Sequence, residues 1–164
     1  MHLFNNVSAG DKAIIEKHLD KVPVPVGALA RELGLEVKLI LLPPDISGEI
    51  RPSPTAPAGF RINVNRHEKK ERQRFTIAHE IGHYLLHRSL IGDGVSDNVL
   101  YRSTLSNQQE VEANKVAAAL LMPRPTVEAL LNTHGGLRSK EVSDLIAEQL
   151  EVSSPAMRIR LGLQ

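Results

Sequence analysis

Apolar residues in the first third of the chain predict two short helices followed by extended segments. Segments 9–20 and 26–33 place apolar residues at helical spacing, and Gly34 stops the second segment. The run 36–42 is apolar and β-branched and ends at two prolines, which predicts a buried strand. A second short strand is expected at 46–50.

The middle of the chain combines an alternating segment with a long helix. Residues 60–65 alternate apolar and polar side chains, which predicts a half-buried strand at the edge or in the interior of a sheet. Asn65 and Glu68 have the spacing of a capping box, so we expect a helix from there to about Arg88. A surface loop or the far side of a hairpin is expected at 51–59, and a loop is expected at 92–98.

The last third is predicted to be helical. Ser106 followed by Gln109 indicates a capped helix that ends at Met122, before a proline. Shorter helices are expected at 126–133, 140–150 and 155–161. We expect a single domain over residues 1–164, with a core to about residue 125 and a C-terminal helical subregion at 126–164.

Composition limits the classes of protein and of site. A chain of 164 residues that is 41% hydrophobic can bury one core. The chain has no cysteine, so a metal site must use nitrogen and oxygen ligands. A net charge of +1 gives no global attraction for nucleic acid. Because no apolar run approaches the roughly 20 residues of a membrane helix, we expect a cytoplasmic protein without membrane contact.

The predicted long helix carries a metal-binding pattern. His79, Glu80 and His83 form the sequence H-E-x-x-H, and the i, i+4 spacing brings both imidazoles to one side of a helix. Two ligands would then converge on one ion. Glu80 lies beside the pair, where a carboxylate can accept a proton from water and return it to a leaving amine. This pattern predicts a metallopeptidase with Glu80 as the catalytic base.

A catalytic zinc site needs a third protein ligand and an open position. A third histidine six residues after His83 is missing, because Ser89 occupies that place. His87 lies one turn further along the helix and cannot easily bend back to the same ion, so a surface or supporting role is expected. The remaining candidates are the acids Asp93, Asp97, Glu110 and Glu112.

Helix geometry favours Glu110 among these acids. Glu110 and Glu112 are two residues apart and point in nearly opposite directions, so at most one can face the metal. Small residues at 113, 117 and 118 would let their helix approach Gly82 closely. Asn114 shares the face of Glu110, where its side chain can accept a hydrogen bond from a ligand imidazole. The alternative is that Glu110 is an ordinary acid favoured by the helix dipole.

Two blocks of sequence, 71–83 and 110–123, resemble the ImmA/IrrE family of metallopeptidases. In that family the acid four residues before the asparagine is the third metal ligand, which corresponds to Glu110 before Asn114. The resemblance implies an α+β, zincin-like fold, in which a small mixed sheet packs on an active-site helix and on a second, ligand-bearing helix. It also implies a Zn²⁺ cofactor, with another divalent ion such as Mn²⁺ as the alternative.

The same resemblance implies an endopeptidase that cleaves a helix-turn-helix repressor and thereby regulates transcription, as in stress responses. Because the chain stops at Gln164, an appended sensor domain is not expected. The alternatives are a DNA-binding regulator or a toxin or immunity interaction module, with a structural or vestigial metal site. Helices 140–150 and 155–161 have helix-turn-helix spacing, but two arginines, Arg158 and Arg160, more often form a solvated face, so packing or repressor docking is favoured.

Substrate-binding features are less defined by the sequence. An extended substrate could add as a strand to residues 60–65 if that strand lies at an edge. A donor to the oxyanion of the transition state is also needed. The side chains with suitable chemistry are Tyr84, His87, Tyr101 and Arg102.

Overall fold

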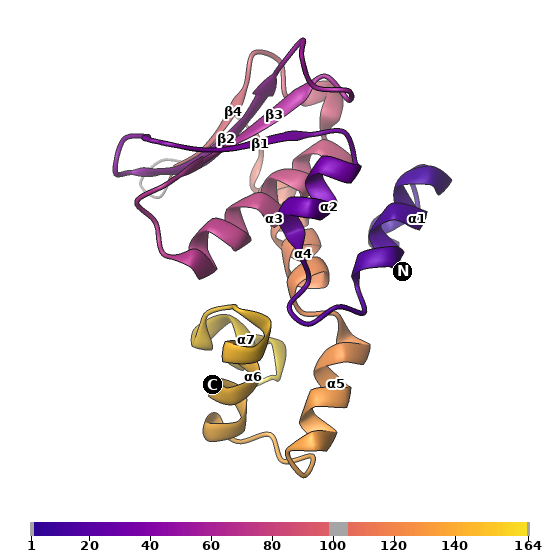
Figure 1. Ribbon diagram of the computed structural model, residues 1–164, viewed down its shortest axis with the longest axis vertical. Helices are drawn as coiled ribbons and strands as arrows, with labels where there is room; N and C mark the ends of the chain where they lie inside the picture. The colour runs from indigo at the N-terminus through magenta and orange to yellow at the C-terminus, as the bar shows by residue number, and fades with distance from the viewer. Residues whose placement is uncertain (1, 99–104, 164) are drawn as a thin grey trace.

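The computed structural model, which describes residues 2–98 and 105–163, places a four-stranded mixed sheet against a group of helices (Figure 1). The strands are β1 (Glu36–Ile40), β2 (Ile46–Pro52), β3 (Phe60–Asn65) and β4 (Val95–Asn98). Their order is β1-β3-β2-β4, with β1 parallel to β3 and the other neighbours antiparallel. Strand β3 therefore lies in the interior, which selects the interior alternative and excludes addition of a substrate strand at 60–65.

Two predictions about strands are wrong. The segment 92–98 is not a loop throughout, because β4 pairs with β2 across an irregularity between Ile46 and Gly48. Long-range pairing, and not an apolar pattern, orders this strand. Strand β1 is not buried either, since it forms the other edge of the sheet and Leu39 is 56% exposed.

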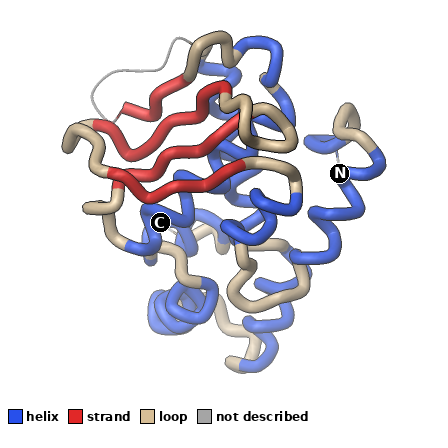
Figure 2. Tube along the Cα trace, turned by 45° about the horizontal axis from the view of Figure 1, so that its top comes forward, coloured by secondary structure: helices blue, strands red, loops and turns tan. Residues whose placement is uncertain are grey.

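Helices cover one face of the sheet and continue below it (Figure 2). The α-helices are α1 (Ala9–His18), α2 (Val26–Glu32), α3 (Lys70–Leu86), α4 (Asn107–Leu121), α5 (Arg124–Thr133), α6 (Lys140–Leu150) and α7 (Ser154–Arg160). Short 3₁₀ helices span His2–Phe4 and Arg88–Leu90. Among the described helices, none is both long enough and apolar enough to cross a membrane.

Helix α3 begins later than predicted, with Lys69 as its N-cap. The expected capping box of Asn65 and Glu68 does not form, because the Asn65 side-chain oxygen accepts from the His67 backbone N–H at 3.1 Å and Glu68 has a distant partner. The Glu68 carboxylate accepts a hydrogen bond from Ser47. The Asn65 amide donates to the backbone carbonyls of Leu42, Pro43 and Ile46. Asn65 thus stabilises the β1–β2 connection, and residues 66–69 connect β3 to α3.

Helix α3 is covered on both sides, so all residues from Thr76 to Tyr84 are buried. The sheet lies on one side, where a Cβ atom on Gly48 of β2 would collide with Thr76. Helix α4 lies on the other side, and its Ala113 sits against Gly82. The predicted capping box of Ser106 and Gln109 is present at the start of α4. The long helix is therefore held rigidly between two layers, as a catalytic site requires.

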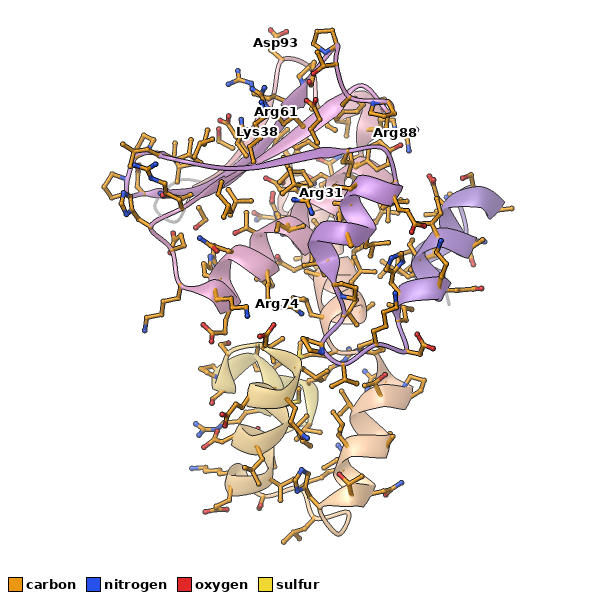
Figure 3. All side chains as sticks on the ribbon, viewed as in Figure 1. Arg31, Lys38, Arg61, Arg74, Arg88 and Asp93 are labelled. Carbon is orange, nitrogen blue, oxygen red and sulfur yellow. The ribbon has the colours of Figure 1, made fainter. Side chains whose placement is uncertain are left out.

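The C-terminal helices are attached to α3 through Glu151. Lys70 pairs with the Glu151 carboxylate at 2.6 Å, and Arg74 donates to the Glu151 carbonyl at 3.3 Å. Figure 3 shows Arg74 between α3 and the helices below it. Arg158 pairs with Asp144 at 3.1 Å within the α6–α7 pair. These contacts connect α6 and α7 to the helix that carries the metal-binding pattern.

Candidate metal centre

Three side chains from α3 and α4 converge on one point. His79 Nε2 and His83 Nε2 lie 3.1 Å apart, and each lies 3.1 Å from Glu110 Oε1. Both histidines are buried, and the Glu110 side chain is only 18% exposed. The i, i+4 spacing on α3 supplies the two imidazoles, and the first turn of α4 supplies the carboxylate.

These atoms fit the requirements of a divalent metal ion. Zinc–ligand bonds of about 2.0–2.1 Å in a tetrahedral site separate the ligand atoms by about 3.3–3.4 Å. The three 3.1 Å separations between His79, His83 and Glu110 are close to that value. Two imidazoles with one carboxylate also match the ligand set of catalytic zinc sites, which leave one position open.

The other nitrogen of His79 is held by Asn114. His79 Nδ1 lies 2.8 Å from Asn114 Oδ1, one turn of α4 beyond Glu110. The amide oxygen can only accept, so Nδ1 donates and Nε2 keeps its lone pair toward the cluster. The hydrogen bond expected from the sequence is therefore present. It fixes both the tautomer and the ring orientation of His79.

His83 is held differently, by His87, for which a surface or supporting role was expected. Its Nδ1 atom lies 2.9 Å from Nδ1 of His87, and Nε2 of His87 lies 2.9 Å from Glu112 Oε1. His87 is the C-cap of α3, with φ −128°, so it leaves the helical path. Its N–H still donates to the His83 carbonyl at 2.8 Å, so the i, i+4 spacing brings the two rings together. Glu112 faces away from the Glu110 cluster, as helix geometry predicted, but it still serves the site through His87.

Burial and hydrogen bonding set the charges of the cluster. Burial alone would raise the pKa of Glu110, but the close contact with the imidazoles of His79 and His83 holds it far below its ordinary value. Burial lowers the pKa of His83 below its ordinary value of 6.5, against the opposing effect of Glu110. The carboxylate is thus charged and His83 is neutral at pH 7. These are the protonation states in which both groups bind metals.

Glu80 occupies the position between the two histidines in the sequence and is completely buried. Thr76, one turn earlier on α3, lies against Gly48 of β2, so Glu80 projects from α3 toward the sheet. Glu80 does not belong to the group of converging ligand atoms from His79, His83 and Glu110.

Other residues considered from the sequence lie apart from the cluster or outside the described residues. Figure 3 shows Asp93 at the outer end of the sheet, where it is exposed. Tyr84 packs edge-on against Phe60 with ring centroids 5.9 Å apart, as expected of a core residue. Tyr101 and Arg102 fall in segment 99–104, outside the described residues, as does the side chain of Asp97.

The family model of the IrrE N-terminal-like domain, a peptidase family, matches residues 36–162. The chain belongs to this family. The match includes both α3 and α4, so the IrrE-like assignment covers the whole three-residue cluster. The resemblance to ImmA/IrrE metallopeptidases is confirmed.

Two relatives of this IrrE-like chain are named radiation response metalloprotease IrrE. The protein from Deinococcus radiodurans is 37% identical over 97 residues, which is 57% of this chain and 28% of that protein. The protein from Deinococcus deserti is 41% identical over 78 residues, which is 45% of this chain and 26% of that protein. The matched region thus spans little more than a quarter of either relative.

A solved structure supports the fold class. A Mycobacterium tuberculosis transcriptional regulator aligns with a TM-score of 0.61 at 19% identity, covering 97% of this chain and 48% of that one. With seven α-helices and a four-stranded mixed sheet in its described residues, the IrrE-like chain has the α+β, zincin-like fold that was predicted.

Proposed function

We propose that this chain is a zinc-dependent endopeptidase that cleaves a partner protein, a helix-turn-helix repressor, and so relieves repression. The observation that carries the proposal is the convergence of His79 Nε2, His83 Nε2 and Glu110 Oε1 at mutual distances of 3.1 Å. Zinc is favoured over Mn²⁺, because Mn²⁺ prefers sites richer in oxygen ligands. The family and the names of the two relatives support a metallopeptidase.

Each residue of the site has a distinct role in this proposal. His79, His83 and Glu110 would hold the metal ion. When bound, the ion supplies Lewis-acid chemistry, which polarises the scissile carbonyl and makes a water molecule more acidic. The Glu80 carboxylate accepts a proton from the attacking water and then delivers it to the leaving amine. Asn114 keeps the His79 ring in place during these steps.

A groove beside the cluster offers room for a polypeptide side chain. It has a volume of about 780 Å³ and lies between the first half of α3, the end of α4 and the C-terminal helices. Its apolar lining includes Phe75, Met122 and Val152. Its link to the cluster is Phe75, whose ring stacks on His79 with centroids 6.0 Å apart. We assign this groove to a part of the substrate away from the scissile bond, because no residue of the cluster lines it.

Direct DNA binding by the C-terminal helices is less well supported. Arg158 is paired with Asp144, and Arg160 donates a hydrogen bond to the carbonyl of Met122. Both arginines therefore stabilise the packing of α7, which favours the packing or docking role. A DNA-binding regulator would instead be indicated by salt-dependent retention of DNA by the metal-free protein without cleavage of any repressor.

The test combines metal analysis of the purified protein, identification of the substrate in cells, and cleavage of the purified substrate. Metal analysis should find about one zinc ion per chain, and His79→Ala or His83→Ala should remove it. Cells that produce the wild-type protein should contain new protein N-termini that are missing with Glu80→Gln. The purified substrate should then be cut by the zinc-loaded wild type, and a chelator should stop the reaction.

The controls separate catalysis from folding and binding. Glu80→Gln should keep zinc while cleavage falls about 10²- to 10⁴-fold, the usual contribution of a general acid–base. Glu16→Gln, a change at an exposed acid of α1, should leave cleavage unaltered. A protein that binds no zinc would refute the proposal. A Glu80→Gln variant with full biological effect would favour a toxin or immunity module.

A further inference from the structure

We propose that His87 and Glu112 are positioning residues that fix the tautomer and orientation of His83 for metal binding. The proposal rests on the proposed function of the metal site and adds two residues to it. A continuous chain of hydrogen-bonding atoms runs from the cluster outward. His83 Nδ1 lies 2.9 Å from His87 Nδ1, and His87 Nε2 lies 2.9 Å from Glu112 Oε1.

The direction of each hydrogen bond in this series is determined by Glu112, at its outer end. A carboxylate can only accept hydrogen bonds, so the Nε2–H of His87 donates to Glu112. The remaining nitrogen of a neutral His87, Nδ1, is then an acceptor, and the Nδ1–H of His83 donates to it. His83 is thereby left with its lone pair on Nε2, the atom that faces Glu110 and His79.

Burial protects these two hydrogen bonds from competition by water. His83 is fully buried and His87 is only 5% exposed, so water does not readily replace either hydrogen bond. The Glu112 side chain is 39% exposed and reaches solvent at the outer end. A negative charge connected through His87 also makes the His83 ring more basic toward a metal ion.

The backbone of α3 and α4 positions both residues. Helix α3 ends at Leu86, and His87 turns out of the helix while its N–H still donates to the carbonyl of His83 at 2.8 Å. Glu112 precedes Ala113, the residue that packs on Gly82. The contact that brings α3 and α4 together thus also determines the distance between Glu112 and His87.

The two histidine ligands are consequently supported by different chemistry. His79 donates to a neutral amide, Asn114, whereas His83 donates to an imidazole that is itself bound to a carboxylate. Loss of an outer hydrogen-bond partner typically weakens metal binding about 10- to 100-fold. We expect this range when the His83–His87 hydrogen bond is removed.

The test compares two substitutions of His87 by zinc affinity, measured in competition with a chelator. His87→Phe keeps a buried ring but removes both nitrogens, and it should weaken zinc binding about 10- to 100-fold. His87→Asn can place its amide oxygen where Nδ1 was, so it should stay within a few-fold of the wild type. A role in packing alone predicts the opposite order, and that result would overturn the proposal.

Further variants keep the test informative if His87→Phe does not fold, which circular dichroism of the metal-free protein would show. Glu112→Ala, at a partly exposed position, should weaken zinc binding several-fold, and Glu16→Ala and His67→Ala at exposed positions should not. Unchanged affinity in Glu112→Ala and in folded His87 variants would refute the positioning role while leaving the metal site intact. Absence of zinc binding by the wild type would instead refute the proposed function.

Discussion

Gly82 of α3 lies so close to Ala113 of α4 that a Cβ atom on Gly82 would come within 3.0 Å of the Ala113 Cα atom. The same atom would meet the Ala113 carbonyl oxygen at 3.1 Å and Val116 Cβ at 3.1 Å. Two of the three neighbours are backbone atoms, so they cannot move without shifting α4. Because α3 carries both histidines and α4 carries Glu110, this contact sets the geometry of the metal centre.

Gly82→Ala should therefore disturb both stability and metal binding. Forcing a methyl group between packed helices typically costs about 1–3 kcal/mol, and here it would also displace Glu110 from the histidines. Urea unfolding and zinc affinity should both show a loss. Gly10→Ala is the matched control, because a Cβ atom there meets nothing within 4 Å on helix α1. It should be neutral or stabilising by up to about 1 kcal/mol. Equal behaviour of the two variants would contradict the close-contact argument.

The two acids of α4 should differ in their effect on the metal. Glu110→Ala removes an oxygen that lies 3.1 Å from both histidine nitrogens. Loss of a residue that only supports a ligand weakens metal binding by up to about 100-fold, so loss of Glu110 should weaken zinc binding by more than that. Glu112→Ala should weaken zinc binding only several-fold, because Glu112 acts through His87. Chelator competition on both variants provides the measurement. Equal losses would show that the two acids do not have these separate roles.

Stability of the metal-free protein should depend on pH through His83 and Glu110. Burial lowers the pKa of His83 from 6.5, and its partners lower that of Glu110 from 4.5, so the unfolded chain binds more protons than the folded one below these values. The free energy of unfolding should therefore fall as the pH drops through 6.5, and again below 4.5. Urea unfolding in the presence of a chelator at pH 7.5, 5.5 and 4 gives the measurement. A free energy that is constant or rises over this range would refute the prediction.

Local spacing was sufficient to predict much of the candidate site. The i, i+4 geometry brought His79 and His83 to one side, and the face of α4 selected Glu110 and Asn114 over Glu112. These arguments need only the regular rise and rotation of a helix. Whether the three converging residues bind metal remains a prediction.

Features that depend on distant partners could not be read from local spacing. Asn65 looked like a helix cap, but its side-chain oxygen accepts from the His67 N–H, and its amide donates to carbonyls about 20 residues earlier in the chain, including that of Ile46. Strand β4 exists because β2 pairs with it. In both cases tertiary contacts override the local pattern.

Glu151 ends α6 in the left-handed conformation, with φ 55° and ψ 46°, where glycine is usual. A non-glycine residue there costs roughly 1 kcal/mol, which the partly exposed ion pair to Lys70 offsets only in part. Glu151→Ala keeps the strain and loses the ion pair, whereas Glu151→Gly loses the ion pair but relieves the strain. We therefore expect Glu151→Gly to be more stable than Glu151→Ala by about 1 kcal/mol in urea unfolding.

A matched pair at Glu148, an exposed position in the ordinary helical part of α6, provides the control. There the order should reverse, with Glu148→Ala more stable than Glu148→Gly by about 1 kcal/mol, because glycine is a poor helix former. The same order at both positions would mean that backbone conformation does not decide the effect at Glu151. A reversal would show that Glu151 occupies a strained backbone conformation, in which its side chain and carbonyl bind Lys70 and Arg74 on the helix with the metal-binding pattern.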